Sequence, residues 1–278
     1  GAAKNIKQTS LIYAAGYDFG RKNKIMKQRF LCLAAALLML LGMLMAATAL
    51  GLTQPEATPQ PQVGLPLAAP ITGSRAWAVQ DGAESATLRY SYPQFEAWLD
   101  VDRAINAYYQ ALAQDMDALE MPVDAEISFE VTHNDKRYIS VVLTSTSMGG
   151  NGESASLSAD TFARDGMYAG QLVTLSQVLG LEQDGGDLSD AASVTESLAY
   201  RLVWQIVERD SENADGDYLD GLTEAELRTA FSPETDFYLD EDGNVVFFIQ
   251  SGEIAGEIAG VLRFPFAPAE LLSAIKES

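Results

Sequence analysis

Oxygen-bearing side chains with the spacing of a calcium loop lie in an acidic stretch of the C-terminal half. Asn213, Asp215 and Asp217 occupy alternate positions, and Glu224 stands at the twelfth position of the same register. An EF-hand loop surrounds calcium with oxygens at these positions. Tyr218 stands where that loop requires glycine, so a solvated acidic loop before the next helix is the alternative. No cofactor is expected apart from calcium at this loop.

Nucleophilic catalysis is disfavoured because the chain lacks the residues for it. His133 is the only histidine and Cys32 the only cysteine. A Ser-His-Asp or Cys-His arrangement could therefore form only at His133, and a zinc site with two histidines is excluded. Paired carboxylates could hydrolyse a glycan, but in so acidic a chain suitably spaced pairs arise by chance. We therefore expect a non-catalytic protein and keep a cell-envelope glycan hydrolase that uses Asp or Glu as an alternative.

Charge is distributed unevenly along the 278 residues, whose formal net charge is -21. Residues 1–30 hold seven Lys and Arg and one acid, whereas the rest of the chain holds 11 basic and 38 acidic residues. Nucleic acid is excluded as a partner of this acidic part, since its phosphates would be repelled. A cationic protein would be attracted.

One uninterrupted apolar stretch, residues 31–52, follows the basic segment. Its 22 residues are long enough to cross a bilayer, and the preceding positive charge keeps residues 1–30 in the cytoplasm as a short basic tail. Its small-residue end at Ala47-Thr48-Ala49 also fits a signal peptide cleaved near Ala49. Both interpretations export the remainder, as a single-pass membrane protein with its C-terminal domain outside or as a secreted protein.

The exported part begins with a Pro-rich linker, residues 53–74, which holds five of the ten prolines. Such a composition favours an extended spacer. The folded unit is expected from about Arg75.

Beyond the linker, hydrophobic periodicity alternates between the patterns of strands and helices. Several strands follow one another as hairpins, so the sequence predicts an α+β fold of mainly antiparallel sheets with packed helices. Thr223 and Glu226 form a capping box for one of the helices. Strands are expected at Ala86–Tyr92, Ala125–His133, Arg137–Ser147, Leu157–Ala163, Phe237–Leu239, Val245–Gln250 and Val261–Phe266, and helices at Val101–Glu120, Ala191–Arg209, Thr223–Ala230 and from Pro268.

A set of short motifs recurs in consistent order over about residues 86–275. They are Tyr92-Pro93-Gln94, Ala104-Ile105-Asn106, Thr161-Phe162, Gly170-Gln171-Leu172, Gly243-Asn244-Val245-Val246-Phe247 and Glu253-Ile254-Ala255. This order resembles the ectodomain of RsiV-type, lysozyme-sensing anti-sigma factors, whose paired extracytoplasmic domains also occur in the N-terminal part of some peptidoglycan deacetylases. The resemblance implies two small, intimately joined subdomains, residues 75–122 and 123–278.

The resemblance also implies an extracytoplasmic sensor that binds lysozyme or another cationic protein. The loops that would face such a ligand depart from the family pattern, which has a histidine after the second strand and Pro-Tyr after Glu-Ile-Ala. The ligand-facing candidates are Asn151, Glu153, Glu253, Ile254 and Glu257. A structural envelope component is a further alternative. Only 25 residues precede Met26, too few for a usual sigma-binding domain, so anti-sigma activity is not implied.

Overall fold

The computed structural model of the chain describes residues 64–77, 86–120, 122–149, 152–181, 188–212 and 218–276. All of them belong to one compact unit, Pro59–Ser278. The predicted cytoplasmic tail, the apolar segment 31–52 and linker residues 53–63 lie outside the described residues. Within the described ranges, no helix has both the length and the apolar character that a membrane span requires.

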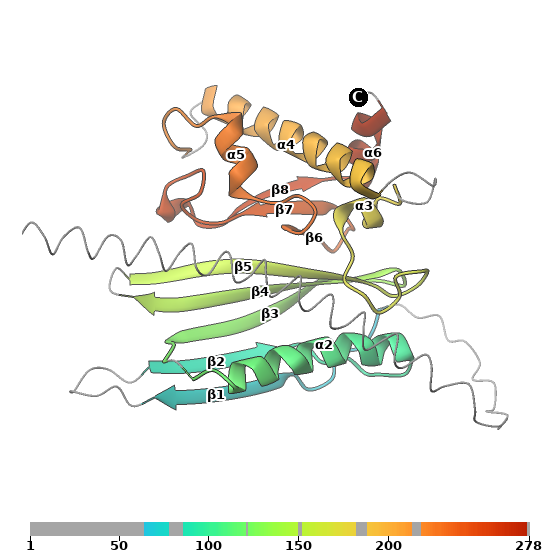
Figure 1. The fold of residues 1–278 in the computed structure, drawn as a ribbon, viewed down its shortest axis with the longest axis vertical. Coiled ribbons are helices and arrows are strands. Elements are labelled where there is room, and N and C mark those ends of the chain that lie inside the picture. Colours follow the sequence, from blue (N-terminus) through green and yellow to red (C-terminus); the bar gives the residue numbers. More distant parts are fainter. Residues whose placement is uncertain are drawn as a thin grey trace, which may run out of the picture. The chain divides into compact units, whose positions relative to one another are not determined.

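A five-stranded sheet forms the N-terminal half of this unit (Figure 1). Its strands follow the chain order, β1(Ile71–Trp77), β2(Ala86–Tyr92), β3(Ala125–Asn134), β4(Tyr138–Gly149) and β5(Gly152–Ala163). Three of the four pairings are antiparallel, while β2 and β3 run parallel. Helix α2(Asp100–Asp117) joins these two strands, as a parallel pair requires a crossover connection.

A smaller antiparallel sheet and four helices follow. The strands are β6(Phe237–Leu239), β7(Val245–Ile249) and β8(Leu262–Phe266), and the helices are α3(Leu175–Val178), α4(Leu188–Glu212), α5(Glu224–Ala230) and α6(Pro268–Lys276). Thr223 caps α5 and forms the predicted capping box with Glu226. The loop between β7 and β8 contains a single 3₁₀ turn, η1(Glu257–Ala259).

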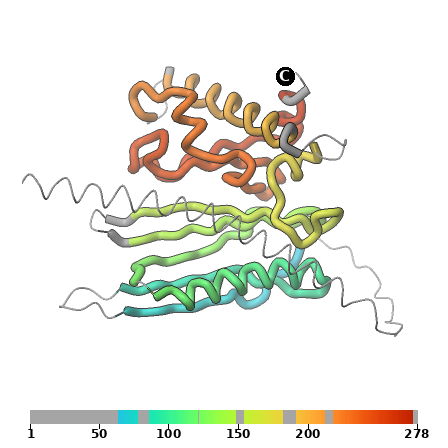
Figure 2. Tube along the Cα trace, in the orientation of Figure 1, coloured from blue at the N-terminus to red at the C-terminus, as the bar shows by residue number. Residues whose placement is uncertain are grey.

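Strand β7 is buried on both faces. The small sheet to which it belongs therefore lies between the helices and the large sheet. Val245, Phe247 and Ile249 pack into the core formed with the helices, whereas Val246 and Phe248 pack against Val142 and Leu157 of the large sheet. The tube trace in Figure 2 follows the same order, from the helices through the small sheet to the large sheet.

Helix α2 covers the opposite face of the large sheet. Ile105 and Tyr109 are completely buried there against Ile139, Val141 and the aromatic residues of β2. The sheet is thus covered on both faces at β4, which has Val142 on one side and Val141 on the other. The α+β prediction is confirmed, with the addition that the large sheet is mixed.

The fold begins earlier than residue 75. Leu65 is 2% exposed, and β1 starts at Ile71, so the C-terminal end of the predicted linker belongs to the folded unit. The sequence did not predict this strand because its residues are small or polar and prolines precede it. Its inward positions are only half-buried. The subdomain boundary predicted between residues 122 and 123 lies between α2 and β3, and it remains a prediction.

Three side-chain amides hydrogen-bond to the backbone of a residue that is distant in sequence. Each amide both donates to and accepts from the backbone of one distant residue: Asn106 pairs with Phe95, Asn134 with Leu65, and Gln250 with Leu157. All six distances lie between 2.7 and 3.0 Å. These amide clamps satisfy backbone groups that would otherwise be desolvated without a partner.

Removing the most buried clamp tests its contribution. Asn106→Ala would leave the backbone N–H and C=O of Phe95 unpaired, and we expect it to lower the free energy of unfolding by about 2 kcal/mol or more. The exposed control Gln171→Ala should stay within about 0.5 kcal/mol of the wild type. Urea unfolding of both variants measures the difference. Equal stabilities would show that the clamp contributes nothing.

Candidate functional site: the paired acidic loops

The loop that joins β7 to β8, residues 250–261, has a fixed backbone. Gly252 and Gly260 adopt φ angles of 79° and 67°, a region that favours glycine. Between them, the N–H groups of Ala259 and Gly260 donate to Gly256 and Glu257 to form η1, and the Ser251 hydroxyl donates to the Glu257 carbonyl at 2.9 Å. The β7–β8 loop is therefore a built turn that can present side chains in defined positions.

A second segment, residues 218–223, pairs with the β7–β8 loop and carries one acid, Asp220. Tyr218 and Ala255 form an antiparallel bridge, and the Leu219 N–H donates to the Ile254 carbonyl at 3.0 Å. The calcium-loop stretch and the Glu-Ile-Ala stretch were separate predictions from the sequence. The structure brings the C-terminal end of the first against the second, next to α5 in Figure 1.

The tandem Glu-Ile-Ala-Gly sequence of this loop holds two isoleucines in opposite environments. Ile254 is completely buried in the core beneath the helices, whereas Ile258 is 103% exposed. The predicted ligand-facing residue Ile254 therefore directs its side chain into the protein interior. The two Glu-Ile-Ala-Gly copies have the same sequence, so the sequence does not indicate which isoleucine is exposed. Ile258 was therefore not among the predicted ligand-facing residues.

Three acidic residues lie near the exposed isoleucine in the sequence or on the segment paired with its loop. Glu257 precedes it on η1 and is exposed, Glu253 is half-buried, and Asp220 is exposed on the paired segment. The basic Arg209 nearby in the sequence is already paired with Asp210 at 2.7 Å. Burial and the charge of Asp210 raise the pKa of Tyr218, which stays neutral over the physiological range. The paired loops thus combine three acidic residues with one fully exposed isoleucine.

The remaining candidates fall partly outside the described residues. Asn151, Asn213, Asp215 and Asp217 lie there, and Glu153 is described only as part of the backbone of β5, where it pairs with Met148. Figure 1 shows that β5 begins at the same end as the β7–β8 loop.

The predicted calcium ligand that can be located is Glu224. Its carboxylate accepts a hydrogen bond from Arg228 one turn further along α5, at 2.7 Å. Within the described part of the chain, no group of three or more His, Cys, Asp and Glu side chains has the arrangement of a metal site. The calcium loop itself remains a prediction.

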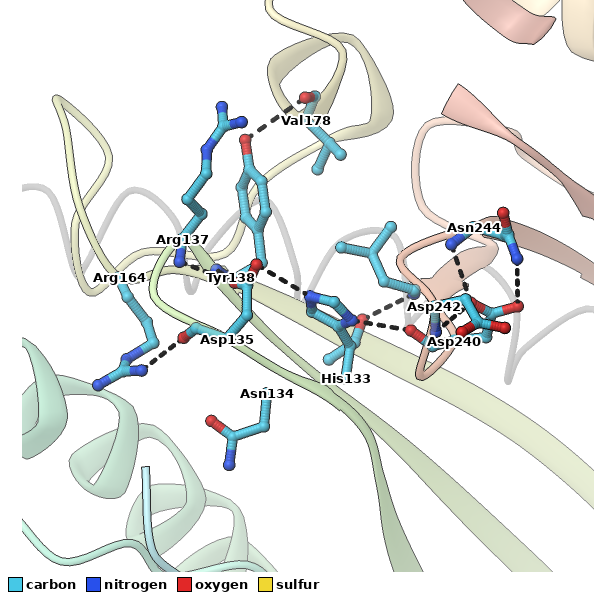
Figure 3. A network of polar contacts seen from close by, with 12 residues as sticks. His133, Asn134, Asp135, Arg137, Tyr138, Arg164, Val178, Asp240, Asp242 and Asn244 are labelled. Carbon is cyan, nitrogen blue, oxygen red and sulfur yellow. Dashed lines mark hydrogen bonds and ion pairs between the residues drawn. The ribbon is translucent and has the colours of Figure 1, made fainter. Parts of the chain in front are cut away.

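His133 lies at the other end of β7, in a polar network between the two sheets (Figure 3). A register shift between Val131 and His133 marks a bulge in β3 at this point. The Nδ1 atom lies 2.8 Å from the Asp240 carbonyl, and Nε2 lies 3.4 Å from a carboxylate oxygen of Asp135. Both neighbours accept hydrogen bonds, so an N–H of the ring can donate to either of them and link the β3–β4 turn to the β6–β7 turn.

Asp135 is held by more than His133. Its other carboxylate oxygen accepts the N–H groups of Arg137 and Tyr138, each at 2.7 Å. Burial alone would raise the pKa of Asp135, but these donors and His133 together lower it below its usual value. The network is a structural junction that anchors the β3–β4 turn to the β6–β7 turn.

No family model and no curated protein matches the chain. A DUF3298 family member from Bacteroides fragilis is similar in structure with a TM-score of 0.45 and 12% identity, over 76% of this chain and 100% of that protein. A DUF3298 family protein from Pseudomonas aeruginosa PAO1 has a TM-score of 0.42 and 14% identity, over 75% of this chain and 93% of that protein.

The two isoleucines of the tandem sequence form a matched test of the packing. Ile254→Ala would leave a cavity in the core, and we expect a loss of about 3 kcal/mol in the free energy of unfolding. Ile258→Ala deletes the same atoms from a side chain that is exposed to solvent. It should change the free energy of unfolding by less than about 0.5 kcal/mol. Denaturant unfolding compares the two. A similar loss in both variants would contradict the assigned environments.

The network around Asp135 predicts a pH dependence with a definite sign. A carboxyl group whose pKa is lowered on folding stabilises the folded state above its unfolded pKa of about 3.8, and the stabilisation is lost as the pH falls through the lower folded pKa. The wild type should therefore be more stable than Asp135→Asn at pH 6, and the difference should shrink toward about pH 2. The exposed control Asp115→Asn should show no comparable trend. A difference that grows on acidification would refute the lowered pKa.

Proposed function

We propose that the chain is the extracytoplasmic binding domain of a bacterial envelope protein and that its ligand is a cationic protein. The observation that carries this proposal is Ile258, a fully exposed isoleucine on a hydrogen-bonded 3₁₀ turn, directly after the acidic Glu257. An exposed isoleucine gains about 2 kcal/mol when a partner covers it, and it is a natural central contact of an interface.

The charge of the protein supports a cationic partner. The formal net charge is -21, and the paired loops carry Glu253, Glu257 and Asp220. Such a field accelerates association with a positively charged protein, while the shape and apolar content of the paired loops determine which protein is retained. Lysozyme is the partner suggested by the resemblance to RsiV-type ectodomains.

The location of the domain is part of the same proposal. Residues 31–52 would hold it at the outer side of the cell membrane, or release it if the chain is cleaved near Ala49. Either arrangement exposes the paired loops to proteins outside the cell, where a ligand such as lysozyme would be met.

Binding of lysozyme to the full chain tests the proposal. The affinity should be highest at low salt and fall as salt screens the acidic surface. Ile258→Ala should weaken binding about tenfold at any salt concentration, since it removes a central apolar contact. The double variant Glu253→Gln/Glu257→Gln should weaken binding mainly at low salt and slow the association rate. Surface plasmon resonance separates these effects.

Two control variants match these changes elsewhere on the surface. Leu172→Ala truncates an apolar side chain that is 43% exposed, and Glu126→Gln/Glu270→Gln removes two exposed charges. Neither should alter the dissociation rate. The proposal fails if lysozyme does not bind at low salt, or if the Ile258 and Leu172 variants lose affinity equally.

A further inference from the structure

A small pocket of about 100 Å³ opens where β4 begins, at the end of β7 opposite to the paired loops. It lies between the start of β4, the turn after β5 and helix α3. The residues that line it are Arg137, Tyr138, Ala163, Asp165, Gly166, Met167, Tyr168, Val173, Gln177 and Gly180. Buried Ala163 and Val173 supply apolar wall, and the polar groups come from three separate segments.

Arg137 supplies a guanidinium group that forms no ion pair with the acids of the described ranges. Its charge lies over the ring of Tyr138 at 5.4 Å, as Figure 3 shows from the side. Among the residues that the structure describes, the ion pairs involve other basic groups, and no carboxylate lies within 4.0 Å of this guanidinium. The neighbouring Asp135 is unavailable, because its oxygens face backbone N–H groups and His133.

Asp165 supplies the opposite charge in the same pocket. Within the described ranges, its carboxylate takes part in no hydrogen bond and no ion pair, and the side chain is exposed. The pocket thus carries one positive and one negative group that do not neutralise each other. Each retains its full capacity to bind a ligand group of opposite sign.

A further donor lies on α3. The Oε1 atom of Gln177 accepts the Thr174 N–H at 2.9 Å as part of the helix cap, which directs the hydrogen-bonding capacity of its amide –NH₂ elsewhere. Gln177 also lines the pocket, so its amide can contribute a hydrogen-bond donor there. Arg137 and Gln177 together make part of the pocket rich in donors.

We propose that this pocket binds a small zwitterion of the amino-acid or dipeptide type, with its carboxylate at Arg137 and its ammonium group at Asp165. The volume has room for about three waters, enough for the charged end groups of a small molecule and more than a single ion needs. A free anion would be repelled by a protein of net charge -21, whereas a zwitterion carries no net charge. The opposite charges of the pocket orient it.

The test compares four probes on the full chain by ligand-observed NMR titration. Valine and alanyl-alanine carry both charges, N-acetyl-alanine carries only the carboxylate, and alaninamide carries only the ammonium group. We expect at least one zwitterion to bind about tenfold more tightly than either singly charged probe. Binding of valine alone, or of the dipeptide alone, identifies which zwitterion fits.

Variants assign the two charges separately. Arg137→Gln should weaken zwitterion binding about tenfold, with partial recovery in Arg137→Lys, and Asp165→Asn should weaken it similarly while sparing N-acetyl-alanine. The control Arg103→Gln, on the outer side of α2, should bind as the wild type does. Unchanged circular dichroism verifies that each variant is folded, and Asp165→Asn tests the proposal even if the Arg137 variants unfold.

Three results would overturn the proposal. The first is absence of binding by both zwitterions at about 10 mM. The second is equal affinity for a zwitterion and for N-acetyl-alanine. The third is unaltered zwitterion binding by folded Arg137→Gln and Asp165→Asn. Because the pocket lies at the end of β7 opposite to the paired loops, the Arg137 and Asp165 variants should still bind lysozyme, so the two proposals can fail independently.

Discussion

The burial of β7 on both faces is the constraint on which the rest of the structure depends. Its five residues are all buried, with three against the helices and two against the large sheet. A strand without a solvent face needs a layer on each side, so neither the helices nor the large sheet can be removed without exposing it. The position of β7 therefore also determines the positions of the two segments that flank it. The β6–β7 turn, which contacts His133 through Asp240, precedes the strand, and the β7–β8 loop follows it.

Hydrogen bonds between distant segments hold these ends in place. Gln250, the residue after β7, pairs in both directions with the backbone of Leu157 and thereby attaches the start of the β7–β8 loop to the edge of the large sheet. At the opposite end, Ser140 accepts the Leu239 N–H at 3.0 Å in a buried position. Such bonds are costly to lose because their groups are already desolvated. The paired loops are consequently built on a rigid support, which reduces the entropy lost on binding.

Local patterns predicted most elements, and tertiary packing decided what they left open. Ala86–Tyr92 and the capping box of α5 were predictable because alternation and N-caps are local signals. Strand β1 was missed, since its small and polar residues form a strand only beside β2. At the site, the two Glu-Ile-Ala-Gly copies are identical in sequence. Only the packing under the helices distinguishes buried Ile254 from exposed Ile258, so no local reasoning could identify the exposed one.

Hydrogen exchange on the full chain, with and without lysozyme, tests most directly whether the paired loops are the binding surface. The account predicts slower exchange of backbone amides in residues 218–223 and 253–260 when lysozyme is bound, since both segments would be covered together. Amides around Arg137 and Tyr138, at the other end of β7, should be unchanged. Protection confined to that end, or no protection of the paired loops in a formed complex, would contradict the account.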